Sequence, residues 1–340
     1  MGGKAGVTCF DCHDPHSGKT RLAVQDNSLC MQCHGPSPRL NAPVIDPLAH
    51  SRHAAGSVGN QCVSCHMIER TYMGIDTRRD HSFRIPRPDL SAQTGAPDTC
   101  TACHTDKDAA WAAALIADWF PDSTHRGPHY GTTFAAAQTD PTKQVQALLA
   151  LAEWKDGPGI VRATAIELLG QAGHAASAGR VEALLTDPDP LVRAAAAGAL
   201  RVLPPDQRLA ALAPLLTDPI RSVREAAAKS LLDAQAAPGT PQAEALGKAI
   251  AEWQQALGTR TDFPETHLQI GGAALQMRNY PLAVQAFETA ASLDPQLVDA
   301  WSMVIRIRAA LGDQAGAAQA LQQALAANPG NPQLMALSGQ

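Results

Sequence analysis

The stretch Cys9-Phe-Asp-Cys12-His13 places two cysteines three positions apart and a histidine directly after the second one. This Cys-x-x-Cys-His pattern occurs four times before residue 105, and the four copies use all 8 cysteines of the chain. The other copies are Cys30-Met-Gln-Cys33-His34, Cys62-Val-Ser-Cys65-His66 and Cys100-Thr-Ala-Cys103-His104. Random placement does not produce four copies with no cysteine left over, so the pattern serves one shared chemistry.

This spacing is the attachment signature of c-type haem. The two thiols can bond both vinyl groups, and the adjacent histidine then reaches the iron as the proximal ligand. The sequence therefore predicts four covalently bound c-type haems. The predicted attachment residues are Cys9, Cys12, Cys30, Cys33, Cys62, Cys65, Cys100 and Cys103, and the predicted proximal iron ligands are His13, His34, His66 and His104.

Three other uses of paired cysteines explain the pattern less well. Zinc sites pair two Cys-x-x-Cys units but do not require a histidine after each one. A thioredoxin-like motif would precede a helix in a βαβ arrangement, and the sequence shows no such arrangement. Disulfide bonds within each pair would leave the four histidines unexplained.

An iron with one histidine ligand still has a sixth position, and the first half of the chain contains six further histidines. A second imidazole on each iron would close it, and closed irons transfer electrons rather than bind substrates. His16 is only three residues from His13, so it would ligate a neighbouring haem. We expect the distal ligands to be His16, His53, His81 and His129, with His50 and His125 as further candidates.

Other residues near the motifs could also serve the haems. Met31, Met67 or Met73 could replace a distal histidine and would raise the potential of that haem. Met67 directly follows a proximal histidine, which also suits packing against a ring. The arginines around His81 could pair with haem propionates or form a solvated surface, and the sequence leaves both alternatives open.

Composition separates the chain into two differently built halves. All 8 cysteines and 10 of the 12 histidines precede residue 130, whereas the sequence from about residue 135 onward is rich in Ala and Leu. The first half has few branched aliphatic residues, and Pro and Gly recur through residues 35–47 and 85–97. We expect loops and short helices there, a longer helix from Asp106 to Trp119, and haem groups in place of an apolar protein core.

Charge and hydropathy exclude some classes of protein. The formal net charge of −5 argues against a nucleic-acid partner, which would need a basic face. No stretch approaches the roughly 18 apolar residues of a membrane helix, and the first residues contain no apolar signal-peptide core. Covalent haem nevertheless predicts export to the periplasm or the exterior of the cell envelope, a conflict that a truncated or misassigned start would explain.

From about residue 140 to 236 the sequence repeats with a period of 31 residues. The equivalent segments are Ile160-Val161-Arg162-Ala163, Leu191-Val192-Arg193-Ala194 and Ser222-Val223-Arg224-Glu225. Asp187-Pro188 and Asp218-Pro219 precede two of them, and Asp-Pro predicts a turn that starts the next helix. We expect each Val to pack inward and each Arg to be presented at the turn. The pattern is typical of HEAT-like helical repeats, with an Ala-rich helical bundle as the alternative.

From Pro264 the period becomes 34 residues, and small or large residues recur at the positions that tetratricopeptide repeats use. The first repeat, residues 264–297, has Gly271, Ala283, Phe287, Ala290 and Pro295 at these positions. The second repeat, from Val298, has Trp301, Ala317, Leu321, Ala324 and Pro329. A third unit begins near Pro332 and stops at Gln340. Such arrays form concave surfaces that bind proteins or peptides.

These features together resemble the multihaem c-type cytochromes that carry HEAT and tetratricopeptide repeats behind a haem domain. The matching stretches are Cys9–His16, Gln61–Met67, Tyr72–Asp76, Arg78–Pro88 and Gly127–Gly131, followed by both repeat arrays. The resemblance covers nearly the whole chain and implies export, covalent haem and electron transfer. It also implies that His53, His81 and His129 occupy recurring positions.

We therefore expect a mainly α protein built from three parts. A loop-rich tetrahaem cytochrome c domain over residues 1–131 precedes an α-solenoid of HEAT-like repeats over 140–236 and tetratricopeptide repeats over 262–340. The expected function is electron transfer, with redox partner proteins docked through the repeats. The alternatives are a multihaem reductase of a nitrogen or sulfur oxyanion and a repeat-based assembly or sensor protein. All four motifs end in His rather than Lys, which favours an electron carrier over an enzyme.

Overall fold

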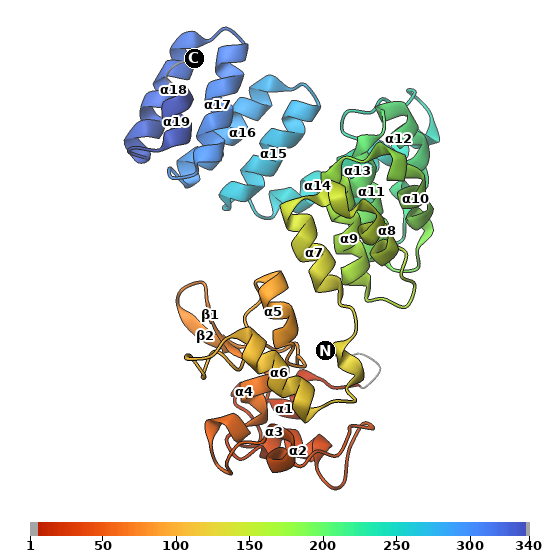
Figure 1. The fold of residues 1–340 in the computed structure, drawn as a ribbon. Coiled ribbons are helices and arrows are strands. Elements are labelled where there is room, and N and C mark those ends of the chain that lie inside the picture. The colour runs from red at the N-terminus through yellow and green to blue at the C-terminus, as the bar shows by residue number, and fades with distance from the viewer. Residues whose placement is uncertain (1–5, 338–340) are drawn as a thin grey trace. The chain divides into compact units, whose positions relative to one another are not determined.

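The computed structural model describes residues 6–337 of the chain. The chain divides into two compact units, Met1–Ala135 and Ala136–Gln340. The first unit contains short helices and loops, and the second contains longer paired helices (Figure 1). The predicted mainly α fold, with a loop-rich first part and helical repeats behind it, is confirmed.

Short helices joined by long loops make up the first unit. Its helices are α1 (Cys9–Cys12), α2 (Ser28–His34), α3 (Pro47–Ser51), α4 (Cys62–His66), α5 (Pro88–Thr94), α6 (Ala109–Trp119) and α7 (Tyr130–Thr139), of which α7 continues into the second unit. The helix predicted to begin at Asp106 begins at Ala109 instead. The Asp108 side chain accepts a hydrogen bond from the N–H of Trp111 (2.8 Å) and thereby caps α6.

A β-hairpin lies between α4 and α5, where the sequence predicted only loops and short helices. Strands β1 (Glu69–Tyr72) and β2 (Asp76–Arg79) pair antiparallel. Met73, Gly74 and Ile75 connect them, and the first two have φ values of 51° and 73°, the left-handed conformation that tight hairpin connections use. Met73, which the sequence offered as an iron ligand, is 78% exposed at the tip of this hairpin.

The first unit has almost no apolar core made of protein. The buried apolar side chains of its described residues are Leu29, Val63, Pro88 and Ala112. Large apolar side chains are instead exposed along the same stretch, among them Phe10, Val44 and Val58. A unit of this size needs more buried apolar surface than these residues supply, as the sequence predicted.

The first half of the second unit is a stack of helices with the repeating valines inside. Its helices are α8 (Val145–Ala152), α9 (Gly159–Ala172), α10 (Ala178–Glu182), α11 (Pro190–Ala199), α12 (Pro205–Leu212) and α13 (Arg221–Ser230). Val161, Val192 and Val223 are buried, as predicted. Asp189 accepts a hydrogen bond from the N–H of Leu191 (2.9 Å), so the second Asp-Pro step of this turn starts α11.

The prediction that the arginine after each valine is presented at the turn is wrong. Arg162 is 5% exposed and donates two hydrogen bonds to the carboxylate of Asp187 in the next repeat. Arg193 bonds Asp218 in the same bidentate way, at 2.9 and 3.0 Å. Because charged bidentate pairs fix geometry as well as add energy, these arginines join each repeat to the next one.

The second half of the second unit consists of one long helix and a series of helix pairs. The helices are α14 (Pro241–Gly258), α15 (Pro264–Gln276), α16 (Tyr280–Leu293), α17 (Val298–Ala310), α18 (Gln314–Ala327) and α19 (Pro332–Leu337). Helices α15, α17 and α19 begin at intervals of 34 residues. A Cβ atom at Gly271 would lie 2.7 Å from the Phe287 ring, so this helix crossing requires glycine. Residue Gln340, where we expected the third repeat to stop, lies outside the described residues.

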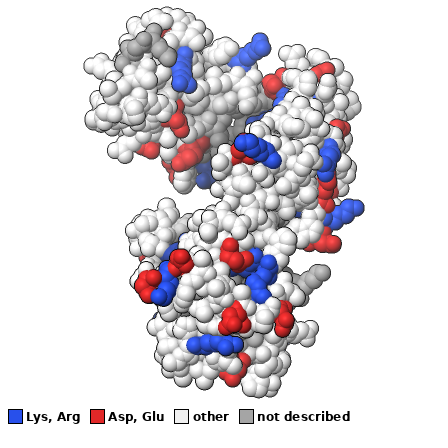
Figure 2. All heavy atoms as spheres, viewed as in Figure 1, with Lys and Arg blue, Asp and Glu red and all other residues white. Residues whose placement is uncertain are grey.

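None of the helices in the described part of the chain is long and apolar enough to cross a membrane. On the face shown in Figure 2, acidic and basic side chains are interspersed over both units, without a broad patch of one sign. The charge distribution on this side agrees with the small net charge of −5.

Candidate haem-binding site

Each of the four motifs folds into one helical turn. The first motif forms α1 and the histidine after it, the second forms most of α2, the third is the whole of α4, and the fourth forms a single turn outside any helix. In that turn the N–H of His104 donates to the carbonyl of Cys100 (2.8 Å), and His13 donates to Cys9 in the same way (2.8 Å). Residues three apart lie on one face of such a turn, so both thiols and the histidine can reach one macrocycle.

Hydrogen bonds tie consecutive motifs to one another. The side chain of Gln32 in the second motif donates to the carbonyl of Asp11 in the first (3.1 Å). Asn27 accepts a hydrogen bond from the N–H of Cys62 in the third motif (2.8 Å). Thr99 donates from its hydroxyl to a main-chain carbonyl of the third motif (2.6 Å). The four attachment turns therefore form one connected cluster.

None of the eight cysteines forms a disulfide bond. A hydrogen bond between the thiols of Cys30 and Cys62 raises the pKa of Cys30 and lowers the pKa of Cys62 to about 7. Burial, followed by the charge of Asp98, raises the pKa of Cys100 to about 11. Because no cysteine is committed to a disulfide bond, all eight remain available for thioether bonds to haem.

Three of the four predicted proximal histidines have a second histidine ring beside them. The ring centroids are 6.1 Å apart for His13 and His81, 6.0 Å for His66 and His50, and 6.2 Å for His104 and His53. The members of each pair belong to different loops or helices, so tertiary packing brings them together.

The separation of these rings fits an axial pair on one haem iron. A bond from imidazole nitrogen to a metal is about 2 Å long, which places two axial ring centroids roughly 6 Å apart. All three pairs have this separation, and each contains one histidine of a Cys-x-x-Cys-His motif. The residues present therefore fit bis-histidine haem.

Hydrogen bonds at Nδ1 leave Nε2 free on four of the six paired rings and on the unpaired His34. A carbonyl oxygen only accepts, so a ring whose Nδ1 meets a carbonyl carries its proton there and keeps the Nε2 lone pair for a metal. The carbonyl partners are Gly18 for His13 (2.9 Å), Pro43 for His34 (3.0 Å), Ser51 for His53 (2.6 Å), Arg84 for His66 (2.9 Å) and Arg79 for His81 (2.8 Å).

His50 and His53 come from one short turn at the end of α3, yet they face different proximal histidines. Asn60 holds this turn, because its side-chain amide donates to the carbonyl of Pro47 (3.0 Å) and to the hydroxyl of Ser51 (2.9 Å). The turn thus presents two imidazoles to the histidines of two separate motifs.

Packing and burial adapt both rings of this turn for ligation. A Cβ atom at Gly59 would lie 2.2 Å from Cδ2 of His53, so only glycine lets that ring take its position. Burial lowers the pKa of His50, and the nearby His66 lowers it further. A lower pKa favours the neutral imidazole, which is the form that binds a metal.

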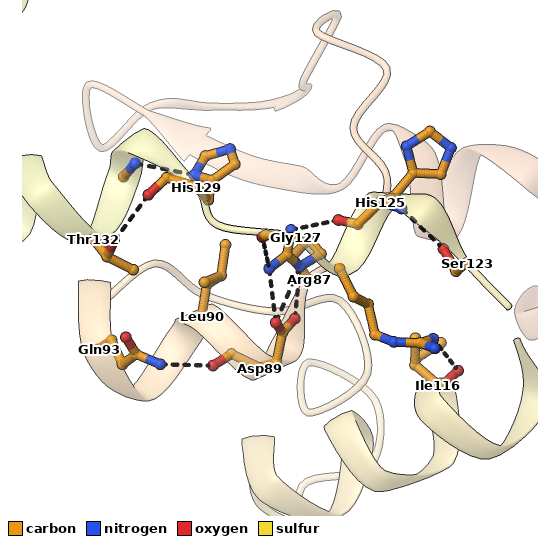
Figure 3. A network of polar contacts seen from close by, with 12 residues as sticks. Arg87, Asp89, Leu90, Gln93, Ile116, Ser123, His125, Gly127, His129 and Thr132 are labelled. Atoms are coloured by element: carbon orange, nitrogen blue, oxygen red, sulfur yellow. Dashed lines mark hydrogen bonds and ion pairs between the residues drawn. The ribbon is translucent and has the colours of Figure 1, made fainter. Parts of the chain in front are cut away.

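His16 and His125 lie on the surface, away from the three pairs. Both are exposed, and neither ring pairs with another aromatic ring within the described part of the chain. Figure 3 shows how Arg87 anchors the segment of His125: it donates to the carbonyls of His125 and Gly127 and bonds Asp89. The sequence thus predicted these histidines as ligands, and the structure does not bring them to a proximal histidine.

His129 has a different hydrogen-bond arrangement from the paired rings. Its Nδ1 accepts a hydrogen bond from the N–H of Gly131 (3.0 Å), so the proton of the neutral ring is on Nε2 (Figure 3). Burial lowers the pKa of His129, and the charges of Arg87 and Arg84 lower it further, although the charge of Asp89 raises it. Ligation by Nε2 would require this ring to exchange its hydrogen bond.

The arginines around His81 support the loop from which it extends. Arg79 donates to the carbonyls of Val63 (3.3 Å) and Met67 (3.1 Å), and Arg84 pairs with Asp80 (3.0 Å). The carbonyls of Arg79 and Arg84 in turn orient two of the paired rings. Their contacts thus have a structural role in the site.

Asn27, Gly59 and Asn60 support the motifs from positions just upstream of them, and the sequence patterns did not identify them. Asn27 precedes the second motif, and Gly59 and Asn60 precede the third, each by no more than three residues. Asn and Gly at such positions commonly serve turns. Their placement next to a motif is the signal that could have identified them.

Four Cys-x-x-Cys-His turns and three facing imidazole pairs are the features expected of a multihaem c-type cytochrome. Residues 2–77 match the family model of Cytochrome c3, and residues 145–232 match that of HEAT repeats. No curated protein matches the sequence significantly. The chain thus combines a cytochrome domain with HEAT repeats, and the first match indicates covalent c-type haem, multihaem electron transfer and a typically extracytoplasmic location. The tetratricopeptide repeats stay a prediction.

Proposed function

We propose that this protein is a tetrahaem electron carrier of the periplasm or of the exterior of the cell envelope. Haem iron, when bound, supplies the one-electron chemistry. The eight motif cysteines attach the macrocycles, and the four motif histidines are the proximal ligands. The distal residues close the iron against other ligands, so that only electrons exchange.

The observation that carries this proposal is the ring separation of 6.0–6.2 Å in three histidine pairs. An iron with two imidazole ligands has no open position for a substrate, which favours electron transfer over a reductase. We therefore propose His81, His50 and His53 as distal ligands of the haems of His13, His66 and His104, respectively.

The haem of His34 needs a distal ligand from elsewhere. His16, His129 and His125 remain our candidates, as the sequence predicted. The hydrogen bond between Gln32 and Asp11 holds the first motif beside the second, which favours His16.

The helical repeats are proposed to dock a redox partner protein. The HEAT match supports a role in protein interaction, because stacked helix pairs build extended surfaces that bind proteins. The tetratricopeptide repeats predicted over residues 262–340 would extend that surface.

Spin state and haem content test the proposed function. Protein made with cytochrome c maturation machinery should gain four haems by intact mass, and electron paramagnetic resonance should show low-spin iron throughout. His81→Ala should leave all four haems attached and turn one of them high-spin, because its iron loses a distal ligand. His174→Ala, at an exposed histidine of the second unit, is the control and should change nothing. Fewer than three haems, or a native high-spin haem that binds nitrite or cyanide, would contradict the proposal.

A further inference from the structure

The three histidines that face a proximal ligand share a second feature, since each has an aromatic ring beside it. The ring centroids are 6.5 Å apart for His81 and Phe83, 6.4 Å for His53 and Trp119, and 5.2 Å for His50 and Phe120. The first two contacts are edge-on, with interplanar angles of 76° and 87°, and the third is tilted at 48°. Edge-on arrangements are among the attractive ones for aromatic rings.

Two of these aromatic residues are consecutive in the chain. Trp119 is the last residue of α6 and Phe120 follows it, and both are half-buried. They lie against His53 and His50, which share one turn but face different proximal histidines. The guanidinium of Arg52, between these histidines in sequence, lies 5.8 Å from the centre of the Trp119 ring. The end of α6 therefore contacts two haem sites at once.

The proximal and distal histidines differ in how firmly the chain holds them. A proximal histidine follows a cysteine that is bonded to the macrocycle, so it stays close to the iron. A distal histidine has no such tether and depends on its surroundings. The Nδ1 atom of His53 is hydrogen-bonded to the carbonyl of Ser51, and the His53 ring lies close to Gly59. Trp119 adds an aromatic contact that these two do not provide.

We infer that Phe83, Trp119 and Phe120 are positioning residues, each of which holds the distal imidazole of one haem against its iron. The inference rests on the proposed function, because it requires the three imidazole pairs to be axial ligands. It adds that the three distal bonds are supported separately, by one aromatic residue each.

Binding of carbon monoxide to the reduced holoprotein tests this inference. Carbon monoxide binds only where the distal imidazole has left the iron. Phe83→Leu, Trp119→Leu and Phe120→Leu should each increase the rate of binding at one haem, at least several-fold over the unaltered protein, with four haems still attached. The variants His81→Ala, His53→Ala and His50→Ala supply the reference spectra for the haem affected in each case.

Trp111→Leu is the matched control within α6. The Trp111 ring lies 5.1 Å from that of His104, a proximal histidine, so its loss should not open a distal position. Trp119→Phe, Phe120→Tyr and Phe83→Tyr keep a ring and should behave as the unaltered protein. If a leucine variant loses haem during maturation, its ring-retaining counterpart decides the matter, because increased binding there would overturn the inference.

The outcomes separate this inference from the proposed function. Unchanged binding in all three leucine variants, or the same haem affected in all three, would overturn the inference while low-spin haems left the electron-carrier proposal standing. High-spin iron in the unaltered protein would instead contradict the proposed function itself.

Discussion

The two units of this protein differ in how much apolar surface their own side chains bury. The described residues of the first unit bury four apolar side chains, whereas the second unit buries a continuous series that includes Leu148, Ile166, Leu200, Leu212 and Leu231, all 2% exposed or less. Apolar burial is the main favourable term in folding. The second unit therefore contains its own driving force, and the first must obtain it from apolar groups attached to the chain.

Exposed apolar side chains beside the motifs point to the same difference between the two units. Phe10 is 59% exposed and Val58 is 64% exposed, and both lie within a few residues of a Cys-x-x-Cys-His motif. Single exposed apolar residues are common in folded proteins, and the second unit has them at Ile160 and Leu311, so what distinguishes Phe10 and Val58 is their position beside the motifs. Haem attached at these motifs, as proposed above, would cover them and supply the apolar surface that the first unit does not bury by itself.

Removal of haem should show the largest difference between the two units. Chain made in a reducing cytoplasm without maturation machinery should have an unfolded, protease-sensitive first unit, because folding there depends on a bound group. The second unit should stay folded. Limited proteolysis followed by mass spectrometry measures both results in one experiment.

The control is the isolated segment of residues 140–340. Its far-UV circular dichroism should be strongly helical, since its core requires no cofactor. A haem-free first unit that resists protease, or a random-coil spectrum of the isolated segment, would show that the contrast between the two units is wrong.

A core substitution in the second unit should have the next largest effect. Leu200 is fully buried, and Leu200→Ala should lower the free energy of unfolding by about 2–5 kcal/mol, because it leaves a cavity. Leu191→Ala, in the adjacent helix α11 at a residue that is 50% exposed, should cost less than about 0.5 kcal/mol. Denaturant titration by circular dichroism gives both values. The haem absorption spectrum should be unchanged, and equal costs at the two sites would refute a core-based second unit.

Sequence patterns predicted the features that depend on local chemistry. The attachment turns follow from a five-residue motif, and the buried Val161, Val192 and Val223 follow from a 31-residue period. In both cases neighbouring residues decide the structure. The helix start at Ala109 differed by three residues because Asp108, rather than an earlier residue, caps the first turn.

Features that depend on long-range packing could not be predicted in this way. The sequence favoured His16 and His129 over His50 as distal ligands. In the structure His50 faces a proximal histidine, because Phe120 and Asn60 hold its turn there. Likewise, Arg162 was expected at the surface because its partner, Asp187, is 25 residues away. No local rule connects such residues, since the contact exists only once the repeats stack.

The smallest expected effect is the loss of stability in acid, where the aspartates of the arginine–aspartate pairs between repeats become protonated. Burial raises the pKa of Asp218, but hydrogen bonds from Arg193 and from the N–H of Ile220, together with the charges of Arg193 and Arg224, lower it to below its usual value. A carboxyl group with a lowered pKa in the folded state adds stability above its unfolded pKa of about 3.9. That contribution is lost as the pH falls through the folded pKa.

The isolated segment of residues 140–340 should therefore lose a small part of its stability as the pH falls below about 4 and this carboxylate takes up a proton. In Asp218→Asn the side chain no longer titrates, so the variant should be less stable than the unaltered segment at neutral pH and should approach it in acid. Denaturant titrations at neutral pH and in acid measure the difference. A difference that does not shrink in acid would show that the charge of Asp218 does not stabilise the contact between these repeats.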